Sequence, residues 1–517
     1  MKPILKRTLT SVAVAAALAI APLANATNGY FKIGYGSKNR GMAGAGMAFG
    51  QDSLAAAINP ATLAGMGNRV DAGVELFSPS QREGGVDATG LMTPDFGNGI
   101  RQGVDIRETS GANIFAIPNF GITMDMGNNI TFGLAVVANG GMNTRYGNAN
   151  AGTGNVFMTA FAPVIGDSSI GTFGGISGFA GAIELGAFDL DGDGTAGGPG
   201  DMIPASVLDP NLANLYLNPN NSPSPGSLGI NLSQVLITPT LAYKINEHHS
   251  VGFAPVIAYQ RFRAYGLGLF QAFSSDPANV TNNGDDESWG YGARIGYQGT
   301  YGMFSVGASY TSKVNMQPFD NYAGLFAEKG DFDIPSTYGI GISIHPSSSL
   351  TIAVDATRIN YSEVAAINNA GPTGNEFLGG FANALITGGG TNLPNALGKN
   401  DGWGFGWDDV NVIKVGVNYM YNSRWTFRAG YNYSEAPYDD SQALFNILAP
   451  AVVQKHATVG FTYSPSTTSE LTMAYMHAFR ESLNYTYQGT GDFAPFSYSA
   501  SQAMSQNAIE VSYAWKF

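Results

Sequence analysis

The amino-acid sequence predicts an all-β protein: a 14-stranded antiparallel transmembrane β-barrel with an N-terminal hatch, or plug, inside its lumen. Three observations predict this fold. Charged residues make up only 12% of the 517 residues, about half the usual share, whereas glycines number 69 and aromatic residues reach 12%. After residue 26 no apolar run is long enough to cross a membrane as a helix. Segments of alternating apolar and polar residues instead follow one another to the last residue, Phe517, as in outer-membrane barrels.

The charge balance and the lack of cysteine exclude several classes of function. The net charge is −13 and no basic cluster occurs, so we expect no nucleic-acid partner. Without cysteine there is no disulfide scaffold, no thiolate metal site and no cysteine nucleophile. The histidines are scattered and no hydrolase or metalloprotease motif is present, so we do not expect an enzyme.

The N-terminus has the three parts of a secretory signal peptide. Lys2, Lys6 and Arg7 precede an apolar run over residues 9–23, and Ala24-Asn25-Ala26 supplies the small residues that a signal peptidase reads. We therefore expect residues 1–26 to be removed on export and the mature protein to pass through the periplasm to the outer membrane of a Gram-negative bacterium.

Residues 27–68 predict the hatch, because this segment is rich in small residues and has no core of its own. Asp52 or Ser53 is expected to cap a short turn over residues 54–58, and Asn59 a second turn with Pro60 at its first position. Two interpretations of Asn59-Pro60-Ala61 stay open: a rigid corner at the base of the hatch, or the part whose position sets whether the path is open.

Residues 69–517 predict the barrel. Short turns between strands are assigned to the periplasm and long polar loops to the outside. The fourteen predicted strands cover residues 69–79, 112–125, 130–143, 232–245, 249–263, 288–299, 302–313, 333–345, 349–362, 408–421, 424–434, 454–464, 469–480 and 505–517.

The longest insertion, about residues 144–231, predicts an extracellular cap over the mouth of the barrel. It contains carboxylates at alternate positions before a glycine, as in the first half of a calcium loop, but the closing glutamate is missing. A structural Ca²⁺ and a solvated acidic loop are both compatible with this pattern, and no other cofactor is expected. The ligands would be Asp189, Asp191, Asp193 and Asp201.

The hatch region carries a family resemblance. Gly36, Gly41, Gly44, Ala48, Asp52 and Asn59-Pro60-Ala61 occur in the order used by the FadL family of outer-membrane transporters for long-chain fatty acids and other hydrophobic compounds, which the chain resembles. The resemblance implies a plugged fourteen-stranded barrel, ligand capture at the extracellular loops, and sideways exit through a gap near a kinked third strand.

The end of the third predicted strand is where such a kink would lie. Asn139-Gly140-Gly141 are poor strand residues and are common at bulges, although they also suit the start of an extracellular loop. The resemblance favours a kink that opens the wall.

Lumen-facing cations are the candidate ligand-binding residues. A buried cation would hold the carboxylate of a fatty acid while apolar side chains hold its tail. The alternative is that these charges pair with each other or with the hatch to fix the plug. The candidates are Arg294, Lys313, Lys414 and Arg428.

The sequence thus favours a monomeric transporter for passive uptake of fatty acids or similar hydrophobic compounds, in contact with lipopolysaccharide and other outer-membrane lipids. An uptake channel for neutral aromatic or alkane hydrocarbons is the alternative within transport. A water-filled porin, which should lack a plug, and an outer-membrane lipid hydrolase are alternatives of other classes.

Overall fold

A computed structural model provides the structure of the chain. It describes residues 28–79, 81–89, 104–146, 228–374, 376, 393–488 and 497–517. Among these residues no helix has the length and apolar character needed to cross a membrane.

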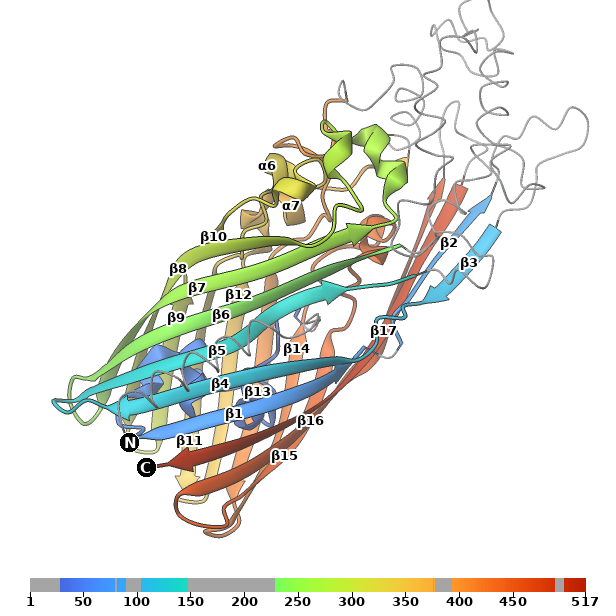
Figure 1. Cartoon of the computed structure of the whole chain (residues 1–517). Coiled ribbons are helices and arrows are strands. Elements are labelled where there is room, and N and C mark those ends of the chain that lie inside the picture. The colour runs from blue at the N-terminus through green and yellow to red at the C-terminus, as the bar shows by residue number, and fades with distance from the viewer. Residues whose placement is uncertain are drawn as a thin grey trace, which may run out of the picture.

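Fourteen strands of the described chain form a closed antiparallel wall (Figure 1), as predicted. Each wall strand pairs with its neighbours in the chain, and β1 closes the barrel by pairing with β17. The wall strands are β1 (Arg69–Ser78), β4 (Phe115–Asp125), β5 (Ile130–Asn143), β6 (Gly229–Lys244), β7 (His249–Tyr265), β8 (Asp286–Tyr301), β9 (Phe304–Thr311), β11 (Thr337–Ser347), β12 (Leu350–Ile359), β13 (Val410–Met420), β14 (Trp425–Ser434), β15 (Lys455–Tyr463), β16 (Ser469–Gln488) and β17 (Ser497–Lys516).

Every predicted strand overlaps one wall strand, but three further strands were not predicted. They are β2 (Glu83–Thr89), β3 (Val104–Thr109) and β10 (Asn315–Met316). The predicted ends of β16 and β17, at residues 480 and 505, also fell short, because this hairpin continues to residues 488 and 497. In the upper part of Figure 1, β2 and β3 extend the sheet alongside β17. The glycine-rich β2 has weak strand propensity, so pairing with the long hairpin decides its conformation.

The outer surface of the wall is apolar, as the alternation predicted. On β11, Ile340 and Ile342 are 66% and 50% exposed, whereas the intervening Gly341 faces the lumen and lies against the hatch. Trp425 and Tyr463 pair across β14 and β15 near the short turns, with ring centroids 4.8 Å apart. Rings at this level match the aromatic girdle that barrels place at a membrane interface.

Residues 28–68 run inside the barrel and form the hatch (Figure 1), in blue. Its helices are short: α2 (Ser37–Arg40), η1 (Ser53–Ala57) and η2 (Pro60–Leu63). The remaining short helices lie in the long loops at the opposite end from the short turns. They are η5 (Gly268–Phe273), η6 (Pro277–Asn279), η7 (Asp320–Tyr322), α6 (Ala327–Gly330), η8 (Tyr361–Glu363), α7 (Ala365–Asn368), η10 (Asp440–Gln442) and η11 (Phe445–Ile447).

Candidate functional site

The corner of the hatch has the two capped turns that the sequence predicted. The Asp52 carboxylate accepts a hydrogen bond from the backbone N–H of Leu54, and Asn59 Oδ1 accepts one from Ala61 N–H, both at 3.1 Å. Pro60 stands at the first position of its turn, where a missing N–H costs nothing. The turns therefore carry their own caps.

The corner is seated against glycines on the inner face of the wall. Asn59 Nδ2 donates to the carbonyl of Met47 at 2.7 Å and to that of Tyr297 on β8 at 2.9 Å. A Cβ on Gly296 of β8 would lie 2.0 Å from Asn59 Oδ1, so only glycine allows this close approach. The contact leaves no room for a ligand between the corner and β8.

Buried carboxylates on one side of the wall hold the hatch by ion pairs. The Glu75 carboxylate of β1 accepts from Arg40 Nη2 at 2.8 Å and also pairs with Lys32, while Glu510 of β17 accepts from Arg40 Nε at 2.8 Å. Glu470 of β16 pairs with Lys38 at 2.5 Å. These groups are almost fully buried, so removing one partner would leave an uncompensated charge.

Beside these carboxylate-bearing strands, the wall is interrupted between β4, which pairs with β1, and β5. The two strands pair only from Asp125↔Thr131 to Phe120↔Val136, although both continue beyond Phe120 and Val136. The β5–β6 register shifts between Ala138 and Gly140, which makes Asn139 a bulge. The sequence-predicted kink at residues 139–141 therefore lies at a break in the ladder between β4 and β5.

The first residues of the hatch, Asn28–Tyr35, form what we call the hatch tail, and part of it pairs with β5 where β4 departs. Lys32 N–H donates to the carbonyl of Asn139 at 3.0 Å, and Gly141 N–H donates to that of Tyr30 at 3.2 Å. A Cβ on Gly140 would lie 1.8 Å from the Tyr30 carbonyl oxygen. Gly140 is thus required for the tail to approach the strand.

A chain of polar side chains links the tail to three strands and a loop. Tyr35 Oη donates to Asn139 Oδ1, Asn139 Nδ2 to Gln234 on β6, and Gln234 to Gln260 on β7, each at 2.9 Å. Gln260 in turn donates to the carbonyl of Phe332 at 2.6 Å. The sequence analysis missed the two glutamines. A glutamine at a lumen-facing position of an otherwise apolar strand was the signal that could have indicated this polar chain.

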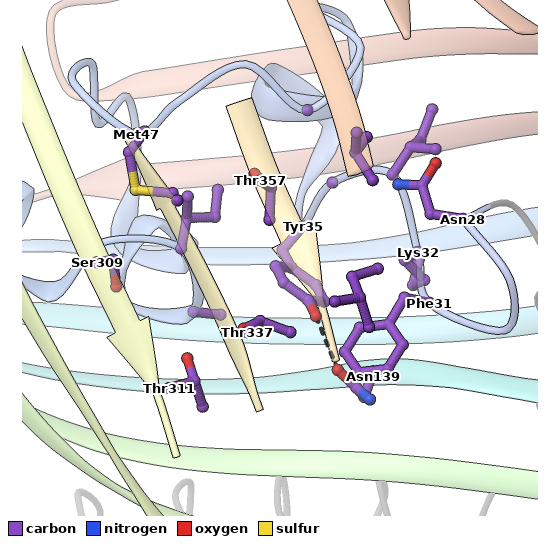
Figure 2. Close-up of a pocket in the computed structure, with 18 of the residues that line it drawn as sticks. Asn28, Phe31, Lys32, Tyr35, Met47, Asn139, Ser309, Thr311, Thr337 and Thr357 are labelled. Atoms are coloured by element: carbon purple, nitrogen blue, oxygen red, sulfur yellow. Dashed lines mark hydrogen bonds between the residues drawn. The ribbon is translucent and has the colours of Figure 1, made fainter. Parts of the chain in front are cut away.

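A cavity, which we call the hatch pocket, lies between the tail and the wall (Figure 2). Tyr35 reaches across it to Asn139, and Ser309, Thr311, Thr337 and Thr357 come from the facing strands. Its lining is mixed, with aromatic, aliphatic, hydroxyl and basic side chains. The lining comprises Asn28, Phe31–Tyr35, Asn39, Gly44, Met47, Ala57, Ile58, Asn139, Leu236, Arg294, Ser309, Thr311, Val314, Ile334, Pro335, Thr337–Gly339, Thr357, Ile359, Val412 and Lys414.

The four candidate cations divide into three kinds of place. Arg294 and Lys414 line the hatch pocket. Arg294 donates to Thr311 Oγ1 at 2.7 Å and to the carbonyl of Ala56 at 3.2 Å. Lys414 makes no hydrogen bond or ion pair with any described residue. Arg428 lies outside the pocket.

Arg428 donates instead to Gln51 of the hatch at 2.8 Å and to Thr462 at 2.7 Å, as a residue that holds the plug would. Lys313 lies at the outer rim, lines neither of the two pockets described here, and pairs with Asp333 at 2.7 Å.

A second cavity, the loop pocket, opens among the extracellular loops and is lined mainly by aliphatic and aromatic side chains. Among the described residues, no charged side chain lines it. The lining consists of Ile230, Phe262, Leu267, Phe270, Leu325, Phe326, Ala366, Leu397, Trp403, Gly404, Phe405, Phe445 and Leu448.

Aromatic rings connect the two pockets. Phe326 of the loop pocket lies 4.8 Å from Phe332, between ring centroids, and Phe332 lies 6.4 Å from Tyr30 of the hatch tail. Tyr30 in turn lies 5.1 Å from Phe31, which lines the hatch pocket. An aromatic path, Phe326–Phe332–Tyr30–Phe31, therefore runs from the loops to the hatch.

The proposed calcium ligands Asp189, Asp191, Asp193 and Asp201 fall outside the described residues. Within the described residues, no group of three or more histidine or carboxylate side chains is arranged to hold a metal ion.

The barrel, its plug and its two pockets agree with a family comparison. Residues 224–517 match the family described as outer membrane protein transport protein (OMPP1/FadL/TodX). The chain belongs to this family. It is therefore a bacterial outer-membrane protein that transports hydrophobic compounds, and it is not an enzyme.

Solved structures show the same fold at low sequence identity. The toluene transporter TodX of Pseudomonas putida aligns with a TM-score of 0.55 and 16% identity, over 94% of this chain and 99% of TodX. The toluene transporter TbuX of Ralstonia pickettii gives 0.51 and 17%, over 94% and 99%. A FadL homologue of Pseudomonas aeruginosa gives 0.55 and 14%, over 95% and 100%. No curated protein sequence matches the chain.

Proposed function

We propose that this FadL/TodX-family protein takes up small neutral hydrocarbons, with monoaromatic compounds as the preferred class. The loop pocket carries the proposal: the described residues that line it include no charged side chain, which favours a ligand without a charge. The aromatic path continues from this pocket to the hatch tail through rings that pack at tilted angles, and such a set of rings favours an aromatic guest. Toluene transporters among the structural neighbours support the same class.

The proposed route ends sideways. The hatch corner fills the lumen against β8, whereas the wall between β4 and β5 is unpaired beyond Phe120 and Val136. Displacement of the hatch tail from Asn139–Gly141 would open this gap to the membrane. In this proposal, Asn59-Pro60-Ala61 blocks the direct route and the kink provides the exit.

Long-chain fatty acids are a second candidate, because of Lys414. This lysine lines the hatch pocket and forms no ion pair with a described residue, although it lies directly opposite Asp355 of β12. Arg294 in the same pocket bonds only to a hydroxyl and a carbonyl. Either cation would suit a carboxylate whose tail follows the aromatic path.

Uptake of labelled toluene and of labelled oleate by cells producing the protein separates the candidates. We expect Phe332→Ala to lower toluene uptake about tenfold, because it removes the ring that joins the two pockets. Phe304→Ala, which removes an exposed ring from the outer surface, is the matched control. Unchanged toluene uptake in Phe332→Ala would contradict the proposed path.

Lys414→Met distinguishes the ligand classes. For a neutral substrate it leaves toluene uptake unchanged. A selective loss of oleate uptake would assign the lysine to a carboxylate and favour the second candidate. Lys313→Met at the rim, which lines neither pocket, should alter neither uptake.

A further inference from the structure

Two prolines face each other across β6 and β7. Pro239 and Pro255 occupy directly opposed places, because the paired residues on either side keep one constant register, from Ile237↔Ile257 to Leu241↔Phe253. The pairing between the strands is lost at residues 238–240 and 254–256 and resumes beyond them without a shift. We call this interruption the proline seam.

The seam follows from the chemistry of proline. Opposed residues in an antiparallel ladder exchange N–H···O=C bonds at alternate positions, and proline has no N–H to give. With proline on both strands, neither donor exists at this place. Each proline remains paired with the strand on its other side: Pro239 with Leu134 of β5, and Pro255 with Ala293 of β8. The fault is therefore confined to the line between β6 and β7.

The seam lies deep in the membrane-spanning part of the wall. Pro255 is six residues from His249 at the start of β7, which places it about 15 Å above the short turns, near the middle of an apolar band of about 25 Å. Carbonyl groups without donors are costly at this depth, and proline in a sheet is otherwise confined to edges and bulges. A fault at such a place calls for an explanation beyond local propensity.

The proline seam and the β4–β5 break lie at the same height in the wall, and the parts of β5, β6 and β7 above that height form one panel. β5 loses β4 after Val136, and Pro239 pairs across β5 with Leu134, only two residues away. Above this level β5, β6 and β7 stay paired with one another, as in Ala138↔Val235 and Val235↔Tyr259. Among the described residues, the β4 side of this three-stranded panel is held by the hatch tail and, at Asn143, by Arg82, but not by another wall strand.

We propose that the proline seam is the flexible line that lets the upper β5–β7 panel swing away from β4, so that Pro239 and Pro255 are positioning residues for the lateral exit. This inference rests on the proposed function, because it gives the mechanical basis of that exit. The missing hydrogen bonds let β6 bend relative to β7 while the ladders on both sides of the seam hold. Substrate need not touch either proline.

The test restores the donors. Pro239→Val/Pro255→Val supplies two N–H groups and keeps apolar, β-branched side chains on the wall. In the full mature protein in lipid nanodiscs, we expect the amides of Val137–Asn143 to exchange with deuterium about tenfold more slowly, because two added hydrogen bonds stiffen the base of the panel. Pro346→Val, at an exposed periplasmic turn, adds a donor away from the seam and should leave this exchange unchanged.

The outcomes separate this inference from the proposed function. Unchanged exchange at Val137–Asn143 overturns the seam as a flexible line, whatever happens to uptake. Slower exchange with lower toluene uptake supports both the seam and the lateral exit. Slower exchange with normal uptake supports the seam and contradicts the exit. If the double variant does not fold, the Pro239→Val and Pro255→Val single variants each restore one donor and should each give part of the slowing.

Discussion

The two sides of the barrel hold the hatch in different ways. On the side formed by β12–β17 and β1, buried carboxylates bind the hatch: Glu75, Glu470 and Glu510 take its arginine and lysines, and Asp355 Oδ2 accepts from Gly46 N–H at 2.7 Å. On the side formed by β5–β9, which we call the neutral side because its described residues form no ion pair with the hatch, side-chain amides, the Arg294 guanidinium, backbone bonds and close packing against glycine hold it. Among the described strands, the charged side has a bulge between Ala478 and Glu481, whereas the β4–β5 break borders the neutral side and the loss of pairing between β6 and β7 lies within it.

In the proposed route, this difference would let the barrel open sideways without losing its plug. Buried ion pairs are costly to break once made, so they suit the side that must stay fixed. Neutral hydrogen bonds contribute about 1 kcal/mol each, so in the proposed route the tail can leave Asn139–Gly141 while the Lys32–Glu75 ion pair keeps it tied to β1. The strength of the hatch contacts on each side therefore matches the continuity of the wall there.

The largest expected effect comes from the charged side. Glu75→Ala leaves Arg40 and Lys32 without their shared carboxylate in a buried site, which should weaken hatch docking by roughly 3–5 kcal/mol. We expect steady conductance to appear in planar bilayers as the plug loosens. Glu83→Ala is the control, because Glu83 pairs with Arg480 in an exposed place where such a pair contributes at most about 1 kcal/mol. A conductance equal to that of the control would show that the ion pairs do not fix the plug.

A smaller effect is expected on the neutral side. In Gly140→Ala the new Cβ would lie 1.8 Å from the Tyr30 carbonyl oxygen, so the tail must leave β5. We expect faster deuterium exchange at Lys32 and Gly141 and about tenfold weaker toluene binding, because the tail forms one wall of the hatch pocket. Conductance should stay low, since the hatch corner remains seated.

Gly268→Ala provides the comparison for Gly140→Ala, since its nearest neighbour to an added Cβ is 3.8 Å away. Normal exchange at Lys32 in Gly140→Ala would contradict the pairing of the tail with β5. A large conductance in that variant would contradict the idea that the charged side alone keeps the plug in place.

The sequence predicted the wall strands because their period-two alternation is a local signal. It predicted the capped turns because Asp52 and Asn59 are strong cap residues and Pro60 directly follows Asn59. The bulge at residues 139–141 was visible for the same reason: glycine and asparagine interrupt a strand pattern. These features depend on residues that are close in the chain.

The missed features depend on partners far away in the chain. Gln234 and Gln260 become significant only when β5, β6 and β7 bring them to Asn139. Pro239 and Pro255 are two ordinary residues until the register places them opposite each other. The roles of Arg428 and Arg294 likewise depend on which part of the hatch they meet.

The smallest expected effect lies on the neutral side, in the loop between β9 and β11, which packs on the hatch tail. Burial and the nearby Asp333 and Glu328 raise the pKa of Asp331 to about 7, and its neighbour Phe332 packs on Tyr30 of the tail. Because the folded-state pKa is raised, the loop is held best at low pH and loses stability as pH rises toward 7 and the carboxyl ionises. Asp331→Asn should remove this dependence: at pH 8 it should slow deuterium exchange over residues 330–334 relative to the native protein, and at pH 4 it should change nothing.

Asp320→Asn is the control, as an exposed aspartate of the same loop. If the two variants behave alike at pH 8, burial of Asp331 does not couple pH to the loop. The mobility of the neutral side would then depend on the wall alone.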